Sequence, residues 1–276
     1  MSSNTYSIAI LIPTRGRTDN LKRCIFSLID QASDPDNLQF LIGFDRDDEI
    51  GLPYFQKEIQ PELDKKNIWY TVVTFDRMGY IGLNHYYNEL AKHMDADWLF
   101  AWSDDSYMET KHWDTIVTSY TGQFKLLKVH AHNEHPYSIF PIWPRAWYDL
   151  FGHCSRHQMV DAELSQMAYW LDIMQIVDIN VMHDRPDLSN RPADATHKQR
   201  VLLEGNPYNP LDFHNPNMVA NRMKDKEVVA KYMESQGLDT TFYRNSLAGT
   251  QDPWVKLVAN DPNAQMTATR RARGLA

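Results

Sequence analysis

Two adjacent aspartates, Asp104 and Asp105, are the residues of this sequence best suited to metal-assisted chemistry. They follow Ser103 at the end of the apolar run at residues 98–102, which predicts a buried strand. Carboxylate oxygens are the ligands that Mg²⁺ and Mn²⁺ prefer, and such an ion can neutralise a departing phosphate group. A solvated turn at the end of the strand is the alternative interpretation of the pair.

Asp161 and His183 are candidates for the rest of a reaction centre. Asp161 lies at the start of a predicted helix, residues 160–171, where it could act as a general base or serve as a helix cap. His183 follows a predicted strand at residues 176–181 and could bind a metal ion or lie in a surface loop. Arg15 and Arg17 follow the first predicted strand, where they could clamp a phosphate or remain solvated.

The elements that must position these side chains alternate between strand and helix over the first hundred residues, which predicts a mostly parallel α/β sheet flanked by helices. In such sheets the loops after the strands gather at one edge, where ligands bind. The predicted strands are residues 7–12, 38–44, 68–74 and 98–102. The predicted helices between them begin at Thr18 or Asp19, span residues 54–65, and follow Gly79 and Gly82.

The second half of the chain has a mixed pattern. Short strands are predicted at residues 125–129 and 138–142. Beyond residue 185 the sequence is rich in Pro and Asn up to Pro216, and helices are predicted at residues 223–235 and 251–258. We therefore expect a catalytic domain at residues 1–185 and a partly helical C-terminal extension at 186–276 that packs on it or forms a lid.

Composition restricts the classes of function. The chain has 276 residues, a net charge of −8 and only two cysteines, Cys24 and Cys154, so neither a disulfide framework nor a general nucleic-acid binder is expected. No apolar run approaches the roughly 20 residues of a membrane helix, and the first residues lack a signal-peptide pattern. These features predict a cytoplasmic protein without a membrane span.

Several of these motifs, taken in order over residues 7–185, resemble glycosyltransferases of the A-type fold, in particular the inverting family 2. In that family the loop after the first strand contacts the nucleotide, and here it is Pro13, Thr14 and Arg15. The second strand ends in an aspartate that contacts the base, usually uracil, and the matching residue is Asp45.

The later family motifs also have counterparts. A glycine-then-asparagine helix start matches Gly79 and Asn84, although Leu83 replaces an arginine that often precedes the asparagine. The family's metal-binding motif falls on Asp104 and Asp105, its acceptor-side acids on Asp161 and Glu163, and its final metal-binding histidine on His183. The resemblance thus implies Mn²⁺ or Mg²⁺ as cofactor and a nucleoside diphosphate sugar as donor.

The expected reaction is metal-dependent transfer of a sugar, from a uridine diphosphate sugar in the first instance, to an acceptor hydroxyl with inversion. The acceptor could be a glycan, a small molecule, a protein or a modified nucleic-acid base. One alternative is a nucleotidyltransferase, but the loop from Thr14 to Arg17 is short and has one glycine, whereas a triphosphate site needs a glycine-rich loop with a lysine. The other is a non-catalytic nucleotide-sugar or glycan-binding module.

Overall fold

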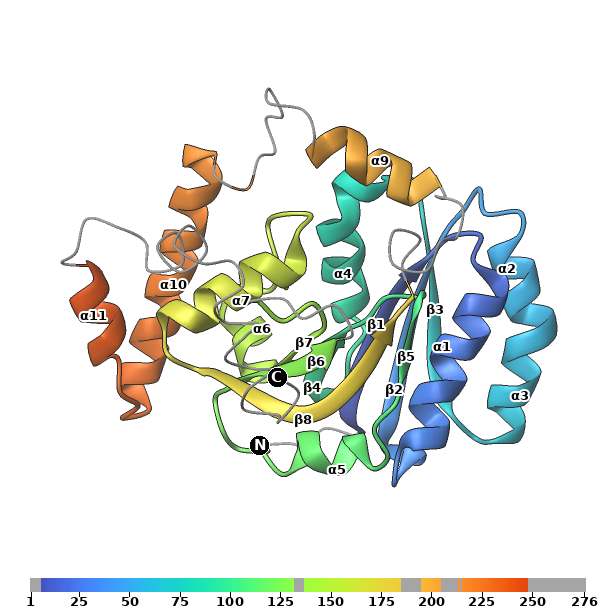
Figure 1. Ribbon diagram of the computed structural model, residues 1–276, viewed down its shortest axis with the longest axis horizontal. Helices are drawn as coiled ribbons and strands as arrows, with labels where there is room; N and C mark the ends of the chain where they lie inside the picture. Colours follow the sequence, from blue (N-terminus) through green and yellow to red (C-terminus); the bar gives the residue numbers. More distant parts are fainter. Residues whose placement is uncertain (1–5, 132–136, 185–194, 205–212, 214, 248–276) are drawn as a thin grey trace, which may run out of the picture.

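The computed structural model describes residues 6–131, 137–184, 195–204, 213 and 215–247. Within these residues the chain forms one eight-stranded sheet in the order β3-β2-β1-β4-β7-β6-β8-β5, with helices packed against its two faces (Figure 1). The expected α/β class is confirmed.

The first four strands form the parallel half of the sheet. They are β1 (Tyr6–Thr14), β2 (Leu38–Asp45), β3 (Trp69–Phe75) and β4 (Ala96–Ala101). β1 lies at the centre of this half, paired with β2 on one side and β4 on the other, and β3 forms the edge. Each strand coincides with a predicted apolar run, as expected for a parallel sheet that is covered on both faces.

The other half of the sheet contains β6 (Leu126–Ala131), β7 (Pro141–Pro144), β8 (Met174–His183) and β5 (Ser106–Met108). β7 is antiparallel to both β4 and β6, whereas β8 is parallel to β6 and antiparallel to β5. β5 has only three residues and was not predicted. It follows β4 directly in sequence, but β7, β6 and β8 lie between the two strands in the sheet, so that β5 forms an edge next to β8.

One face of the sheet packs against α1 (Thr18–Gln31), α5 (Trp113–Thr118) and a helical segment at residues 51–65. That segment comprises α2 (Gly51–Tyr54), a π-helical turn η2 (Phe55–Ile59) and α3 (Gln60–Lys65). Leu21, Cys24, Ile25 and Leu28 of α1 are fully or almost fully buried, as their helical spacing predicts.

The opposite face packs against α4 (Leu83–Ala91), α6 (Arg145–Phe151) and α7 (Val160–Trp170). Two C-terminal helices, α10 (Pro216–Ser235) and α11 (Thr241–Leu247), lie outside this layer, and α10 contacts both α6 and α7. α10 begins earlier than predicted, because the side chain of Asn215 accepts a hydrogen bond from the amide of Asn217 and caps the helix. The helix predicted at residues 251–258 lies outside the described residues.

A further helix, α9 (Ala195–Glu204), was not predicted. It lies across one end of α4 (Figure 1) and contacts the short turn η3 (Tyr80–Gly82) that precedes α4. α9 therefore brings a distant part of the chain to the edge of the sheet where β1, β2 and β4 end.

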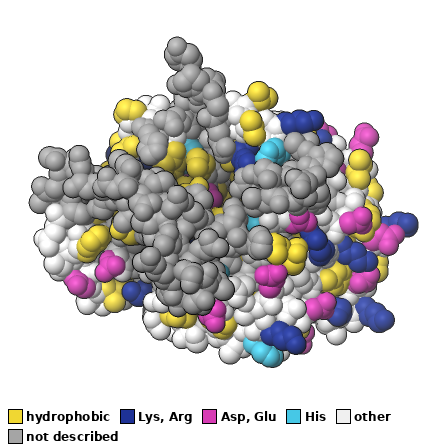
Figure 2. All heavy atoms as spheres, in the orientation of Figure 1, with side chains coloured by type: hydrophobic (Ala, Val, Ile, Leu, Met, Phe, Trp, Pro, Cys, Tyr) yellow, Lys and Arg dark blue, Asp and Glu magenta, His cyan; other side chains and the backbone are white. Residues whose placement is uncertain are grey.

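Figure 2 shows the charged side chains of the described residues on one face of the molecule. Acidic and basic side chains are interspersed on the right-hand side of that view, over the region of α1 to α3. Among the described helices, none is both long and apolar enough to cross a membrane.

Candidate active site

A cavity of about 450 Å³ opens at the carboxyl ends of β1, β2 and β4. Hydrophobic, basic and acidic side chains meet in the hollow at the centre of the face shown in Figure 2. Most of the residues that the sequence singled out line this cavity. They are Pro13, Thr14, Arg15, Arg17, Asp45, Gly79, Asp104, Asp105, Asp161 and His183.

Asn84 does not line the cavity. Its side chain is 6% exposed within α4, and its neighbour Leu83 lines the cavity instead. The departure from the family pattern at Leu83 is thus a change in the cavity wall itself.

Asp45 closes one end of the cavity. Arg15 donates a hydrogen bond of 3.0 Å to one carboxylate oxygen of Asp45, and the hydroxyl of Tyr86 donates to the other. Burial, followed by the hydrogen bond to Asp45, raises the pKa of Tyr86 to about 12, so the phenol remains a donor at neutral pH. The sequence analysis missed Tyr86, although it lies on the helix that follows the Gly79 turn.

The aspartates at and after the end of β2 make different contacts. Asp47 pairs with Arg15 at the surface, whereas the buried carboxylate of Asp48 accepts hydrogen bonds from the amides of Gly16 and Gly51. Asp48 therefore ties the loop after β1 to the start of α2, and among these aspartates it is Asp45 that lines the cavity.

Asp104 and Asp105 are buried at the turn after β4, and each of their carboxylate oxygens has a partner. Thr14 donates to Asp104 at 2.6 Å, and Ser103 donates to Asp105. A single nitrogen of Arg17, Nη1, lies 2.6 Å from Asp104 Oδ1 and 2.9 Å from Asp105 Oδ2. Arg17 thus bridges the two carboxylates.

The two aspartates differ in how their surroundings affect ionisation. Burial raises the pKa of Asp104 above its ordinary value, although the charge of Arg17 opposes this. Burial acts in the same direction on Asp105, but the hydrogen bond with His183 and the charge of Arg17 outweigh it and hold the pKa of Asp105 well below its usual range.

His183 reaches this pair through the register of β8. It lies opposite Ser106 in the antiparallel pairing of β5 and β8, and its Nε2 is 3.3 Å from Asp105 Oδ1. Among the described residues, no hydrogen-bond partner exists for the buried Nδ1 of His183. The predicted proximity of His183 to the aspartates is therefore present in the structure.

Two carboxylates and an imidazole are a donor set that suits Mn²⁺ or Mg²⁺. In chemical type these residues fit a divalent ion. In the part of the chain that is described, however, no group of three or more His, Cys, Asp or Glu side chains has the arrangement of a ready metal site. Arg17 takes the position between the two carboxylates.

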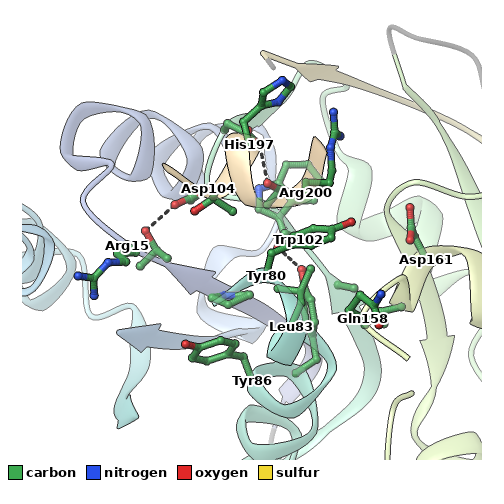
Figure 3. A pocket seen from close by; sticks show the side chains of 18 of the residues that line it. Arg15, Tyr80, Leu83, Tyr86, Trp102, Asp104, Gln158, Asp161, His197 and Arg200 are labelled. Atoms are coloured by element: carbon green, nitrogen blue, oxygen red, sulfur yellow. Dashed lines mark hydrogen bonds between the residues drawn. The ribbon is translucent and has the colours of Figure 1, made fainter. Parts of the chain in front are cut away.

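Asp161 lines the side of the cavity that lies away from Arg15. In Figure 3, Arg15 and Asp161 lie on opposite sides of the view, with Asp104 and Arg200 between them. Asp161 is in the first turn of α7, where the positive end of the helix dipole favours a carboxylate. Gln158, Met159 and Val160 line the cavity beside it.

Glu163, the second acid of this motif, points elsewhere. It is 1% exposed and accepts hydrogen bonds from the hydroxyl of Ser155 and from the amides of Arg156 and His157. Glu163 therefore fixes the loop that leads into α7, and Asp161 is the acid of the pair that faces the cavity.

The sequence analysis missed the residues that α9 contributes. His197, Gln199 and Arg200 line the cavity. The side-chain oxygen of Gln199 accepts a hydrogen bond of 3.2 Å from the amide of Tyr80. The basic residues of α9 could have indicated a phosphate-binding role. The helix itself was missed because it lies in a Pro- and Asn-rich segment whose composition favours a loop.

The sequence matches no protein-family model and no curated protein. Solved structures do share the architecture. The mannosyltransferase PcManGT from Pyrobaculum calidifontis, in complex with GDP-mannose and Mn²⁺, is 11% identical with a TM-score of 0.54, and the alignment covers 99% of this chain and 82% of that one. This similarity shows that the chain has the fold of an A-type glycosyltransferase.

TarS from S. aureus also aligns with this chain. The structure of its residues 1–349 in complex with UDP is 12% identical with a TM-score of 0.49, covering 72% of this chain and 70% of that one. A second TarS structure is 12% identical with a TM-score of 0.48, and there the alignment covers 72% of this chain and only 42% of that one.

Proposed function

We propose that this protein is a glycosyltransferase that moves a sugar from a nucleoside diphosphate sugar to an acceptor hydroxyl. The observation that carries the proposal is one cavity at the carboxyl ends of the strands. It is lined by Pro13, Thr14 and Arg15 at the end of β1, by the two buried aspartates and by Asp161. Ligands of open α/β sheets bind at this edge, and the shared fold with a sugar transferase is consistent with it.

The donor would lie with its base near Asp45, whose carboxylate can accept a hydrogen bond from a base N–H. The N3–H of uracil is such a donor, and uracil is the base that the family resemblance implies. The diphosphate would lie near Asp104, in the cavity that the guanidinium-bearing residue Arg200 also lines.

Asp104, Asp105 and His183 are the residues that would hold Mn²⁺ or Mg²⁺. When bound, such an ion would stabilise the negative charge that develops on the departing diphosphate. The side chains of Thr14 and Ser103 already orient the two carboxylates by hydrogen bonds.

Asp161 is the proposed general base. The acceptor oxygen bonds to the anomeric carbon while its proton passes to the Asp161 carboxylate, and the electron pair of the breaking bond leaves with the diphosphate oxygen. Attack from the face opposite the diphosphate inverts the anomeric configuration. The acceptor is a hydroxyl-bearing molecule that reaches the Asp161 side of the cavity.

The proposal is tested by thermal unfolding with nucleoside diphosphates and their sugars, with and without Mn²⁺, followed by an assay for sugar release. A ligand that binds only the folded state raises the unfolding temperature. We expect stabilisation by one diphosphate and slow release of free sugar from the matching donor. Binding without any release would identify a binding module, and the absence of any stabilisation would overturn the proposal.

A further inference from the structure

Arg17 is held against the aspartate pair from a fixed backbone position. It directly precedes α1, and its carbonyl accepts a hydrogen bond of 2.9 Å from the amide of Leu21. Its side chain is 17% exposed and lines the cavity, so the guanidinium lies between the buried carboxylates and the open space.

The guanidinium uses the same oxygen atoms that a metal ion would need. Its Nη1 contacts Asp104 Oδ1 and Asp105 Oδ2 at once, while the other oxygens of the two carboxylates bind Thr14 and Ser103. An arginine does not lose its proton in proteins, so this positive charge persists at any working pH. A divalent ion that entered with Arg17 in place would meet a cation a few ångströms away.

A bound diphosphate would weaken the hold of the aspartate pair on Arg17. It brings several negative charges into the cavity that Arg17 lines, and arginine pairs well with phosphate oxygens. Moving from the carboxylates to the diphosphate would give the guanidinium a new anionic partner and leave the carboxylate oxygens to the ion.

We propose that Arg17 is an internal counter-ion that blocks the metal site of the empty protein, so that the divalent ion and the diphosphate bind cooperatively. This inference rests on the proposed function and goes beyond it, because it sets the dependence of one ligand on the other. Binding cooperativity is reciprocal: the diphosphate raises metal affinity by the same factor by which the metal raises diphosphate affinity.

The test is calorimetric titration of Mn²⁺ alone into the metal-free wild type and Arg17→Gln. Arg145→Gln is the matched control, because it also removes one positive charge but Arg145 contacts Asp95 and Asp149, which do not line the cavity. We expect Arg17→Gln to bind Mn²⁺ alone about tenfold or more tightly than the wild type, within the usual range of coupling between sites. Arg145→Gln should match the wild type.

A second titration uses the wild type with and without saturating UDP, which keeps the inference testable if Arg17→Gln does not fold. UDP should raise the Mn²⁺ affinity of the wild type by about tenfold or more. It should raise that of Arg17→Gln by much less. Equal Mn²⁺ affinity with and without UDP in the wild type, or equal affinity in wild type and Arg17→Gln, would overturn the role of Arg17.

Failure of this inference differs from failure of the proposed function. UDP and GDP titrations in EDTA measure nucleotide binding without metal. A protein that binds no nucleotide under any condition refutes the proposed function, whereas the comparison of Mn²⁺ affinities between wild type and Arg17→Gln decides the role of Arg17 by itself.

Discussion

The side-chain oxygen of Gln199 lies 3.2 Å from the backbone amide of Tyr80 and accepts its hydrogen bond, although the two residues are 119 positions apart. This contact joins α9 to the turn at Gly79, which lines the same cavity as the two buried aspartates. It also sets where His197 and Arg200, on the same helix, meet the cavity. The C-terminal part of the chain thus contributes directly to the candidate site.

Replacing Gly79 by any other residue should destabilise the folded protein. Its backbone angles, φ 67° and ψ −168°, fall in a region that only glycine adopts readily, and a Cβ would lie 2.8 Å from the Gln199 oxygen. Gly79→Ala should therefore lower the free energy of unfolding by about 1–3 kcal/mol, measured by urea denaturation. In Gly79→Ala/Gln199→Ala the combined loss should be smaller than the sum of the single losses, because both changes break the same hydrogen bond. Strict additivity would contradict this.

Arg200 should contribute to diphosphate affinity rather than base affinity. Arg200→Ala should weaken UDP binding by roughly 10- to 100-fold, since a hydrogen bond to a charged group contributes about 1.5–3 kcal/mol. Uridine binding should stay unchanged, and calorimetry can measure both. Lys198→Ala is the matched control, because Lys198 is an exposed cation on the same helix that does not line the cavity. Equal effects of the two substitutions on UDP would refute a direct role for Arg200.

Asp161→Asn should separate binding from transfer. The amide keeps the shape of the side chain but cannot take up a proton, so donor affinity should persist while the transfer rate falls by roughly 10²- to 10⁴-fold. The measurements are UDP-sugar calorimetry and a transfer assay once an acceptor is found, with donor hydrolysis as the interim readout. Transfer at the wild-type rate would show that Asp161 has only a structural role in the first turn of α7.

Asp104→Asn should remove the effect of Mn²⁺ on nucleotide binding. The substitution converts a charged ligand to a neutral amide, which binds divalent ions weakly. UDP affinity should then be the same in Mn²⁺ and in EDTA. Asp36→Asn, at an exposed position outside the cavity, removes the same charge and should keep the Mn²⁺ effect. A persistent Mn²⁺ effect in Asp104→Asn would argue against Asp104 as a ligand.

The buried carboxyl of Glu163 should make the free energy of unfolding depend on pH. Burial raises the pKa of Glu163 above its ordinary value of 4.5, so between the unfolded and folded pKa values the folded state binds more protons. The contribution of Glu163 to stability therefore falls as the pH rises through this window. Urea unfolding followed by tryptophan fluorescence, from about pH 4 to 7, should show the wild type losing stability relative to Glu163→Gln. A constant difference between the two proteins would contradict the raised pKa.

Much of the fold could be predicted from the sequence because local signals are strong in its first half. The runs that became β1, β2 and β4 are continuous and apolar, and α1 has a clear apolar face. Local sequence patterns did not predict the elements whose structure depends on tertiary contacts. β5 is only three residues long and is held by its pairing with β8, and α9 lies in a segment whose composition favours loops.

For the site, the sequence predicted which edge of the sheet most of the cavity-lining residues would occupy. It did not predict their hydrogen-bond and ion-pair partners. The strand ends brought Thr14, Asp45 and Asp104 to one cavity, as the parallel topology requires. The link of Arg17 to the aspartates, and that of Tyr86 to Asp45, join segments far apart in the chain. Such pairs depend on the packing of helices against the sheet, which no local pattern encodes.

The position of β8 has a consequence for how the protein acquires its site during folding. β8 inserts between β6 and β5, His183 comes with it, and the amide of Asp184 donates to the carbonyl of Asp105 at 2.8 Å. The turn that carries the aspartates is thus completed by a strand that arrives much later in the chain, and such non-local pairings form slowly. A refolding chain should regain helical circular dichroism before it regains the ability to bind a nucleotide.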